Sequence, residues 1–228
     1  RKVPLNANYQ LGAQNLLAAT DSHTKVIWIC SPNNPTGNDL DPDAIKQVLT
    51  EFDGIVVVDE AYSDFSSCPP FRTLLGSYPN LIVLNTMSKA WASASVRLGM
   101  AFASQQIIAL FNKVKYPYNI NKLTQEYASA LLDDSFKVQR WVAQIKEERA
   151  HLLPAFRELP VCKEIYSTGA NFFLVKVTDA PSIYHYLVDK GIIVRNRNRV
   201  EMCEGCLRIT VGTPQENNEL LSALRQYK

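Results

Sequence analysis

The sequence predicts an α/β protein with a mostly parallel sheet flanked by helices, followed by a smaller α+β domain. Two aliphatic runs, residues 26–30 and 55–58, have the length and the β-branched content of buried parallel strands. Between them, apolar residues recur at helical spacing over positions 45–52. Alternation of strand, helix and strand is the pattern of βαβ units, which build parallel sheets covered on both faces.

The elements of the first domain follow in order. The opening residues 1–5 resemble a strand. The helix between the two aliphatic runs is expected to begin at Asp41, because a capping carboxylate there is followed by Pro42 in the first turn. Residues 81–84 and 98–102 are apolar and predict two more strands of the same sheet.

A long amphipathic helix is expected from Ser135, with Pro154 bending or interrupting it. Beyond it the pattern becomes that of an α+β module. Its strands are expected at residues 171–177, 192–195 and 207–211, and its helices at residues 183–190 and 214–225. The predicted division is residues 1–140 for a cofactor-binding domain and residues 141–228 for a small C-terminal domain.

Composition excludes several classes of function. A net charge of +2 gives no case for nucleic-acid binding, which calls for a dense basic patch. No apolar run approaches the length needed to span a bilayer, so we expect no membrane role. Five scattered cysteines favour a reducing, cytoplasmic compartment. Cys203 and Cys206 have metal-like spacing, but without a second pair or a nearby histidine we predict no metal site.

The most informative stretch is Thr-Met-Ser-Lys-Ala at residues 86–90, with Arg97 eight residues after Lys89. It places one amine beside an anion-binding pair, Ser88 and Arg97. A lysine becomes a nucleophile when a nearby cation or desolvation lowers its pKa. The stretch therefore favours a lysine that carries an aldehyde cofactor. The alternative is a surface helix start with one lysine.

Two other strand ends carry polar groups. Asp59 ends the second aliphatic run, and ligands of open α/β sheets bind outside the carboxyl ends of the strands. A protonated pyridine nitrogen would stabilise such an acid, although Asp59 as a helix cap is the alternative. Asn34 lies in the proline-rich loop after the first run, and with Tyr62 it could donate to a phenolate oxygen. Such loops are often only turns.

Several blocks together resemble a known family. Asn34-Pro35-Thr36-Gly37, Asp59-Glu60-Ala61-Tyr62 and Ser88-Lys89 with Arg97 resemble the signature blocks of the fold-type I pyridoxal-phosphate aminotransferases. The blocks Gly-Ile-Ile-Val-Arg at residues 191–195 and Cys-Leu-Arg-Ile-Thr-Val-Gly-Thr at residues 206–213 resemble those of its histidinol-phosphate aminotransferases.

The resemblance implies pyridoxal 5'-phosphate as cofactor. Lys89 would hold it covalently and move the proton between substrate and cofactor, and Asp59 would pair with the pyridinium nitrogen. Four residues are implied in the remaining contacts, namely Asn34 and Tyr62 at the 3-oxygen and Ser88 and Arg97 at the phosphate.

The resemblance also implies how the substrates are held. Arg208 would bind the carboxylate of glutamate, and Arg195 the phosphate of histidinol phosphate, because a guanidinium meets two oxygens at once. Arg195, Arg197 and Arg199 alternate with asparagines, so an extended segment would place all three on one face. We favour Arg195 for the phosphate. The other two would be a solvated edge.

The sequence departs from the family in two places. Relatives carry glycine where this chain has Ser95, and a serine would be strained if that position needs a positive φ. The family's N-terminal part, which supplies further phosphate contacts, the ring stacked on the cofactor and much of the dimer contact, is expected to lie outside these residues. The 228 residues alone are therefore expected to hold an incomplete, inactive site of a homodimer.

The function that the resemblance implies is transamination between glutamate and imidazole-acetol phosphate, giving L-histidinol phosphate and 2-oxoglutarate in histidine biosynthesis. One alternative is another enzyme of the same fold, an aromatic aminotransferase or a decarboxylase of phosphorylated threonine. The other is a regulatory module that binds the cofactor without turnover. Arg195 is the discriminating residue, since its removal should weaken binding of a phosphorylated substrate far more than binding of glutamate.

Overall fold

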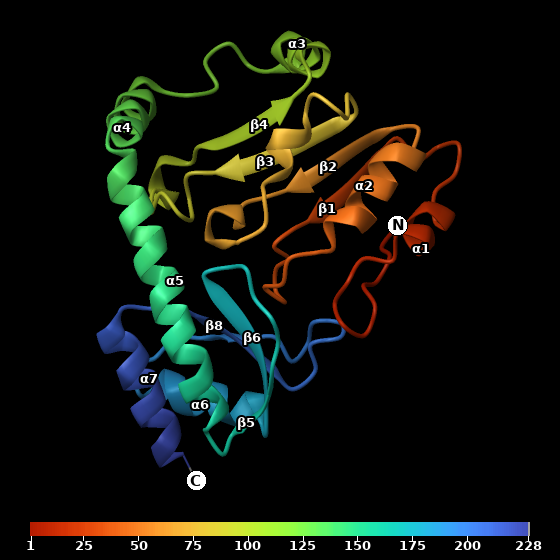
Figure 1. Ribbon diagram of the computed structural model, residues 1–228. Helices are drawn as coiled ribbons and strands as arrows, with labels where there is room; N and C mark the ends of the chain where they lie inside the picture. The colour runs from red at the N-terminus through yellow and green to blue at the C-terminus, as the bar shows by residue number, and fades with distance from the viewer. Residues whose placement is uncertain (228) are drawn as a thin grey trace. The chain divides into compact units, whose positions relative to one another are not determined.

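The computed structural model describes residues 1–227, which form two compact units (Figure 1). The first contains residues 1–32 and 39–139, and the second contains residues 33–38 together with the chain from residue 140 onward. The boundary in the long helix lies next to residue 140. The short loop 33–38 belongs to the second unit, which the sequence pattern did not indicate. The assignment of residues 1–140 and 141–228 as functional domains stays a prediction.

The first unit is built around a four-stranded sheet with the order β1-β2-β3-β4 (Figure 1). Its elements are α1 (Ala13–Ala18), β1 (Val26–Cys30), α2 (Pro42–Glu51), β2 (Ile55–Asp59), the short 3-10 helices η1 (Ser63–Phe65) and η2 (Phe71–Leu74), β3 (Leu81–Thr86), the 3-10 helix η3 (Ala94–Val96), β4 (Gly99–Ala103), α3 (Gln105–Val114) and α4 (Lys122–Asp133).

Three strands of this sheet are parallel and the fourth is antiparallel. β1, β2 and β3 pair in parallel, whereas β4 pairs with β3 in the opposite direction. The sheet is therefore mostly parallel, as predicted, and β4 is its antiparallel edge strand. The connection from β3 to β4 contains only the 3-10 helix η3, and a parallel return needs a longer crossover. The predicted strand over residues 1–5 is wrong, since no strand forms there.

Helices cover both faces of the first sheet. On one face, Ile45, Val48 and Leu49 of α2 pack with Ile27 and Val56 in a single buried cluster. On the other face, Ile107 of α3 packs against Val57 and Ile82. The alternating side-chain directions of the strands divide them between these two clusters. Asp41 caps α2 by accepting from the Asp43 amide, as predicted, with Pro42 at the first helical position.

The second unit has an antiparallel sheet with the order β5-β6-β8-β7. The helix α5 (Ser135–Arg157) leads into it, followed by β5 (Cys162–Ile165), β6 (Phe172–Val177), α6 (Ala180–Asp189), β7 (Arg195–Asn196), β8 (Cys206–Thr210) and α7 (Pro214–Gln226). The strand β5 was not predicted. The strand expected at residues 192–195 is reduced to β7, because Gly191 takes a positive φ and residue 192 still bonds back to Leu187.

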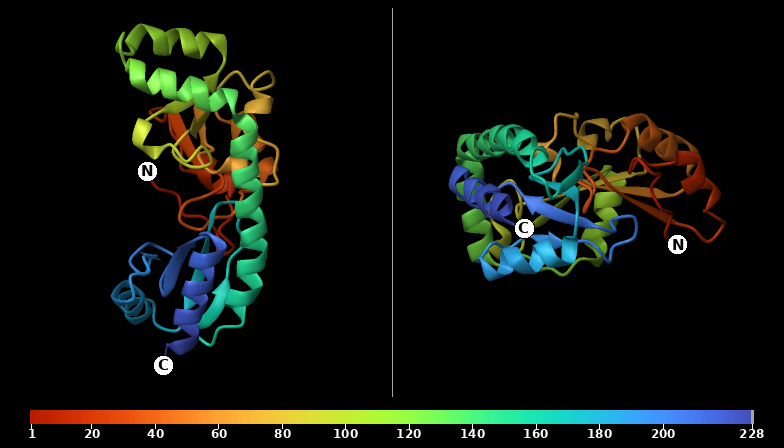
Figure 2. Two further views of the ribbon diagram at one scale, coloured as in Figure 1. Left: turned by 90° about the vertical axis from the view of Figure 1, so that its left-hand side faces the viewer. Right: turned by 90° about the horizontal axis from the view of Figure 1, so that it is seen from below.

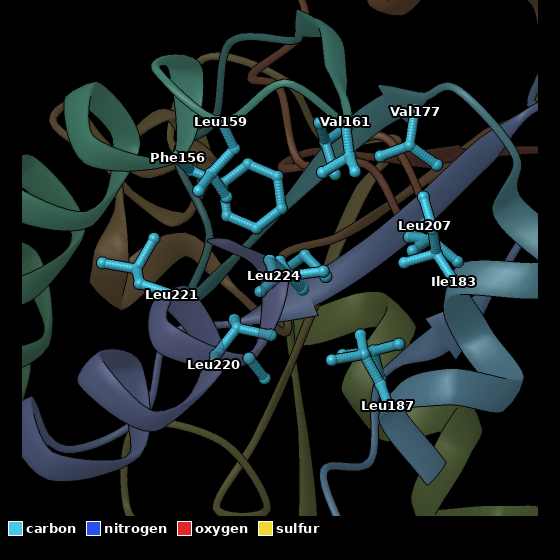
Figure 3. Packing of buried hydrophobic residues seen from close by; sticks show 14 of the residues in the cluster. Phe156, Leu159, Val161, Val177, Ile183, Leu187, Leu207, Leu220, Leu221 and Leu224 are labelled. Atoms are coloured by element: carbon cyan, nitrogen blue, oxygen red, sulfur yellow. The ribbon is translucent and has the colours of Figure 1, made fainter. Parts of the chain in front are cut away.

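Helices α5, α6 and α7 supply the core that covers one face of this sheet (Figure 3). Phe156 of α5 meets Phe173 of β6 edge to face, with the ring centroids 5.4 Å apart. Ile183 and Leu187 of α6 and Leu224 of α7 complete the packing. The core uses alternate residues of β6 and β8, so their remaining side chains lie on the opposite face.

The helix α5 does not break at its proline. Pro154 lies inside the helix, which continues to Arg157 and runs on without interruption in the left view of Figure 2. Of the predicted bend or interruption, the interruption is wrong, because Pro154 removes only one backbone donor and the helix continues beyond it to Arg157.

Within residues 1–227, none of the helices combines the length and the apolar character required to cross a bilayer.

Candidate functional site

Asp59 is the last residue of β2, at the edge where the parallel strands of the first unit end. Its Oδ1 accepts a hydrogen bond from the Ala61 amide at 3.0 Å. The carboxylate therefore stabilises the turn that follows the strand. It does not cap a helix, since the residue preceding η1 is Tyr62. One carboxylate oxygen of Asp59 thus bonds to the adjacent turn, and the position at the end of β2 places the acid at the edge of the sheet.

Lys89 lies in the turn that follows β3, the strand next to β2. The turn is closed by hydrogen bonds from the Ala92 amide to the Lys89 carbonyl and from the Ser93 amide to the Met87 carbonyl. Met87 and Ala90 are buried, whereas Lys89 is exposed. Burial of its two neighbours anchors the turn and leaves the lysine amine outside. No helix begins at this point, so the alternative of a surface helix start is wrong.

Tyr62 and Lys89 meet at this edge of the sheet. The Lys89 Nζ lies 5.1 Å from the centroid of the Tyr62 ring, within the range of a cation–π contact. Tyr62 itself is buried, so the ring is a fixed surface rather than a mobile one. The structure thus brings together two residues that are 27 positions apart in the sequence, from the ends of neighbouring strands.

Ser88 and Arg97 are placed by the same turn. The Ser88 Oγ lies 3.0 Å from the Thr86 hydroxyl, and the Ser88 amide donates to that hydroxyl at 3.1 Å. Arg97 ends η3 in the left-handed conformation with φ 54°, and its Nη1 donates to the Ala94 carbonyl at 2.9 Å. Ser95 lies inside η3 without a positive φ. The expected strain at Ser95 is therefore absent, and Arg97 itself takes the unusual conformation.

Asn34 lies in the loop 33–38, which is fastened to the second unit through Gly37. The Gly37 carbonyl accepts from the Gly169 amide at 2.8 Å and from the Thr168 hydroxyl at 3.3 Å. Gly37 has φ +88°, and a Cβ there would lie 2.8 Å from the Thr168 Oγ1. Only glycine combines this φ with this close approach. The loop is thus a built part of the unit rather than a simple turn.

Arg208 makes specific contacts within the second unit. Its Nη1 donates to the Asn34 Oδ1 at 2.7 Å, and its guanidinium carbon lies 4.6 Å from the centroid of the Phe172 ring. Since an arginine only donates, the bond fixes the orientation of the Asn34 amide. The Nδ2 group of Asn34 takes no part in this bond, and the implied hydrogen bond to a phenolate oxygen would come from that group.

Arg195 is the partner of Arg208 across the strands β7 and β8. Residues directly opposite in an antiparallel pair project from the same face, so the two arginine side chains start from one face of the sheet. Arg195 forms no ion pair with a carboxylate of residues 1–227. Two like charges placed opposite each other are unfavourable unless an anion joins them. The pair has the charge that suits a phosphate or a carboxylate.

The predicted site residues fall into two groups. The first unit holds Asp59, Tyr62, Ser88, Lys89 and Arg97, of which Tyr62 and Lys89 are in contact. The second unit holds a separate group, in which Arg208 joins Asn34 and Arg195.

Sequence reasoning missed two residues that shape these groups. The Thr86 hydroxyl holds Ser88, and Phe172 lies beside Arg208. Thr86 could have been found from its place at the strand end of the same short run. Phe172 carries no local signal, because its role depends on strand pairing.

The donor set of the first unit fits a phosphorylated pyridine aldehyde. An amine, a carboxylate and a hydroxyl paired with a guanidinium are the groups that such a molecule requires. All of them lie on or just after the ends of adjacent strands, or in the loop that joins β3 to β4.

Comparison with known proteins decides the family. The family model "Aminotransferase class I and II" matches residues 1–224. The chain belongs to the class I and II aminotransferase family. The family is dependent on pyridoxal phosphate, and the resemblance based on the signature blocks is confirmed.

Among curated proteins, the histidinol-phosphate aminotransferase of Bacteroides thetaiotaomicron is 54% identical over all 228 residues, which cover 66% of its length. The chain thus spans slightly less than two thirds of this relative. The aminotransferase fold is also evident in solved structures. The crystal structure of the histidinol-phosphate aminotransferase from Clostridium acetobutylicum has a TM-score of 0.89 at 23% identity, over 97% of this chain and 69% of that one.

A second solved aminotransferase is the histidinol-phosphate aminotransferase from Sinorhizobium meliloti in complex with pyridoxal-5'-phosphate. It has a TM-score of 0.85 at 22% identity, over 99% of this chain and 63% of that one. At these identities the two structures show the fold alone. The predicted α/β class is confirmed in this form, as one mixed, mostly parallel sheet and one antiparallel sheet with helices.

Proposed function

We propose that the protein is a cytoplasmic transaminase of histidine biosynthesis. It would exchange an amine between glutamate and imidazole-acetol phosphate, giving L-histidinol phosphate and 2-oxoglutarate. The relative from Bacteroides thetaiotaomicron, which carries the name of this activity, supports the proposal over the full length of the chain. The structural observation that carries it is the pairing of Arg195 with Arg208 across β7 and β8, because two arginines on one face of the sheet suit a substrate that brings its own phosphate.

Lys89 has the central role in the proposed reaction. When bound, pyridoxal phosphate supplies a cationic ring that accepts electrons from the substrate carbon. The Lys89 amine holds the cofactor and moves a proton to and from that carbon as a general base and acid. Its place above the buried Tyr62 ring limits where Nζ can go. Asp59 would keep the ring nitrogen protonated, since a carboxylate favours a nearby positive charge.

Ser88 and Arg97 would bind the cofactor phosphate. The Thr86 hydroxyl and its bond to the Ser88 amide hold the serine in place at the end of β3. Arg97 is exposed and its Nη1 is directed to the Ala94 carbonyl, which leaves further guanidinium donors for an anion. We assign the phosphate contact to these two residues as part of the proposal.

In the second unit, Arg208 would bind the carboxylate of glutamate and Arg195 the phosphate of the alternative substrate. Both substrates must use one site in turn, because the amine passes between them. Two arginines on one face of the sheet meet this requirement, since both anions can be bound by the same pair. The Asn34 amide would donate to the 3-oxygen of the cofactor through Nδ2.

We further propose that the protein is a homodimer. The helices α3 and α4 and the loop between them expose an unusual number of large apolar side chains. Val114, Tyr118 and Leu123 are 81%, 96% and 79% exposed. Exposed apolar side chains gathered on consecutive elements are typical of protein interfaces. In the proposed homodimer, a second copy of the chain would cover these exposed apolar side chains.

The role of Lys89 is tested by trapping. Full-length wild-type protein incubated with pyridoxal phosphate and reduced with borohydride is expected to gain the mass of the cofactor on the peptide that contains Lys89. Lys89→Ala should lose this label and at least about 10³-fold of the transaminase rate, because both the attachment and the proton transfer depend on one amine.

Lys163→Ala is the matched control, since Lys163 is an exposed lysine of β5 outside the proposed site and the proposed dimer contact. It should keep both the label and the rate. Covalent labelling that persists in Lys89→Ala would show that another lysine binds the cofactor.

The substrate assignment is tested with Arg195→Leu. Loss of a charged hydrogen-bond partner should raise KM for histidinol phosphate by about 10²-fold. KM for glutamate should change much less. Arg199→Leu, which removes an exposed arginine four positions later, is the control. Equal losses for both substrates would favour an aromatic aminotransferase, and release of carbon dioxide from phosphothreonine would favour the decarboxylase. A protein that binds the cofactor without any turnover would be a regulatory module.

A further inference from the structure

Glu60 is a buried acid that the proposed reaction does not use. It follows Asp59 at the end of β2 and is 2% exposed. Its Oε1 accepts a hydrogen bond from the Phe71 amide at 2.6 Å. Its Oε2 is buried and has no hydrogen-bond partner among residues 1–227. A buried carboxylate oxygen without a partner is costly, so a further group or a proton is expected there.

A small cavity adjoins this carboxyl group. Glu60 lines it together with the hydroxyl-bearing residues Ser31, Ser63 and Ser66. Its volume is about 10 Å³, which is enough for about one water molecule. A water needs two to four polar partners to occupy such a place, and a carboxyl oxygen with serine hydroxyls meets this condition. The cavity therefore offers the missing partner of Oε2.

The backbone of Glu60 is fixed from several sides. Its amide donates to the Leu84 carbonyl at 2.8 Å. Its carbonyl accepts from the Ser63 amide at 3.0 Å and from the Asn85 Nδ2 at 3.3 Å. With the side-chain bond to Phe71, one residue joins β3, η1 and η2. Glu60 is thus the point at which the segment between Asp59 and Tyr62 is fastened to the sheet.

The charged groups around Glu60 decide its protonation. Burial raises the pKa of Glu60 to about 7, and the nearby Asp64 of η1 adds to this, whereas the Phe71 amide and Arg72 of η2 lower it. Asp39 and the Cys68 thiol line the same cavity from the neighbouring loops. Burial also raises the pKa of Asp64. A protonated Glu60 can donate from one oxygen while it accepts at the other, which suits the observed contacts.

We propose that Glu60 is a positioning residue that holds the Asp59–Tyr62 turn through Phe71 and through one water in the adjoining cavity, in its protonated form. The turn carries the two residues that we assign to the cofactor ring, so the functional part of this inference rests on the proposed function. The structural part is independent of it, because the anchor exists without cofactor.

The sign of the pH dependence follows from the burial. The folded protein retains the Glu60 proton up to about pH 7, whereas the unfolded chain releases it near the ordinary pKa of 4.5. The stability contribution is complete below pH 4.5 and is lost as the pH rises through about 7. The thermal midpoint of the protein without cofactor is expected to fall by about 5 °C or more between pH 5.5 and pH 8.5.

Glu60→Gln tests the protonation, because the amide mimics the neutral carboxyl and cannot ionise. Its midpoint should lie at or slightly above that of the wild type at pH 5.5, where part of the Glu60 contribution is already lost, and should lack the further fall at higher pH. Asp64→Asn measures how much of the fall in the thermal midpoint comes from Asp64, whose pKa is also raised by burial. Glu158→Gln, which alters an exposed glutamate, should behave as the wild type does. A fall of equal size in Glu60→Gln and in the wild type would overturn the assignment.

The positioning role has its own readout. The Kd for pyridoxal phosphate should rise by about 10-fold from pH 6 to pH 8.5 in the wild type and stay level in Glu60→Gln. Parallel Kd profiles would overturn the positioning role while leaving the stability result intact. If the wild type binds no pyridoxal phosphate at all, the proposed function fails, and the midpoint experiment still decides the anchor. A crystal structure at pH 6 should show a water molecule within hydrogen-bond distance of the Glu60 Oε2. A cavity without a water molecule would overturn this part of the proposal.

Discussion

At the scale of single residues, Gly37 shows how one backbone position controls a side chain that bears chemistry. Its φ of +88° and its close approach to Thr168 hold the loop 33–38 on the second unit. The loop in turn presents Asn34 to Arg208. The sequence block Asn-Pro-Thr-Gly is thereby explained in physical terms, since its last residue secures the position of its first asparagine.

Alanine substitutions at three glycines should separate the cost of the strained φ from the cost of the clash with Thr168. Gly37→Ala combines a strained φ with a clash and is expected to lower the free energy of unfolding by about 1–3 kcal/mol. Gly191→Ala carries the strained φ of +77° with open space around it, and should cost less. Gly76→Ala meets neither condition and should be neutral or slightly stabilising. Thermal unfolding of the three variants measures this order of destabilisation. A smaller loss of stability in Gly37→Ala than in Gly191→Ala would contradict it.

At the scale of elements, the closing helix α7 begins with a complete capping box. The Thr213 hydroxyl accepts from the Glu216 amide, and the Glu216 carboxylate accepts from the Thr213 amide at 2.8 Å. The same contacts lower the pKa of Glu216. The stabilisation is therefore present above the ordinary pKa of 4.5 and is lost as the pH falls through the lowered value. α7 supplies three leucines to the core of the second unit, so its start matters for the whole unit.

Removal of this cap gives a second prediction. Thr213→Ala should lower the free energy of unfolding by about 1 kcal/mol at pH 7, because the Glu216 amide at the helix start loses its partner. The control is Thr50→Ala in α2, where the hydroxyl only bonds back to the Lys46 carbonyl. Chemical denaturation of both variants at pH 7 measures the difference. Equal stability of the two variants would show that the box is redundant.

At the scale of the whole molecule, the exposed apolar side chains of α3 and α4 are a feature that packing within residues 1–227 does not explain. Most of the apolar residues in the sheets are buried, yet Leu110 of α3 and Tyr127 of α4 are 58% and 50% exposed. Trp28 of β1 is also 67% exposed. Exposed apolar surface lowers solubility unless a partner covers it.

A charge placed on this surface should weaken self-association. Leu123→Asp is expected to raise the dimer dissociation constant by at least about 10-fold, because an unpaired carboxylate would be buried in the contact. Ser129→Asp, on the same helix at an exposed polar position, is the control. Sedimentation velocity over a range of protein concentrations measures both. If Leu123→Asp remains as dimeric as the control, the contact lies elsewhere.

Local chemistry allowed much of this protein to be predicted. The strands around Val56 and Ile82, the cap at Asp41 and the long helix from Ser135 follow from short patterns of apolar spacing and capping. The signature blocks around Lys89 also led to the family, because an amine, an acid and their neighbours keep a recognisable order along the chain.

Contacts between distant residues could not be predicted in the same way. The antiparallel direction of β4, the place of loop 33–38 in the second unit and the pairing of Arg195 with Arg208 join parts of the chain that no local pattern connects. The burial of Glu60 is of the same kind, since its neighbour Asp59 looks equivalent in the sequence. Local sequence determined which elements form and which chemistry they carry. Only tertiary packing decided which charges meet, because strand register and burial depend on residues far away along the chain.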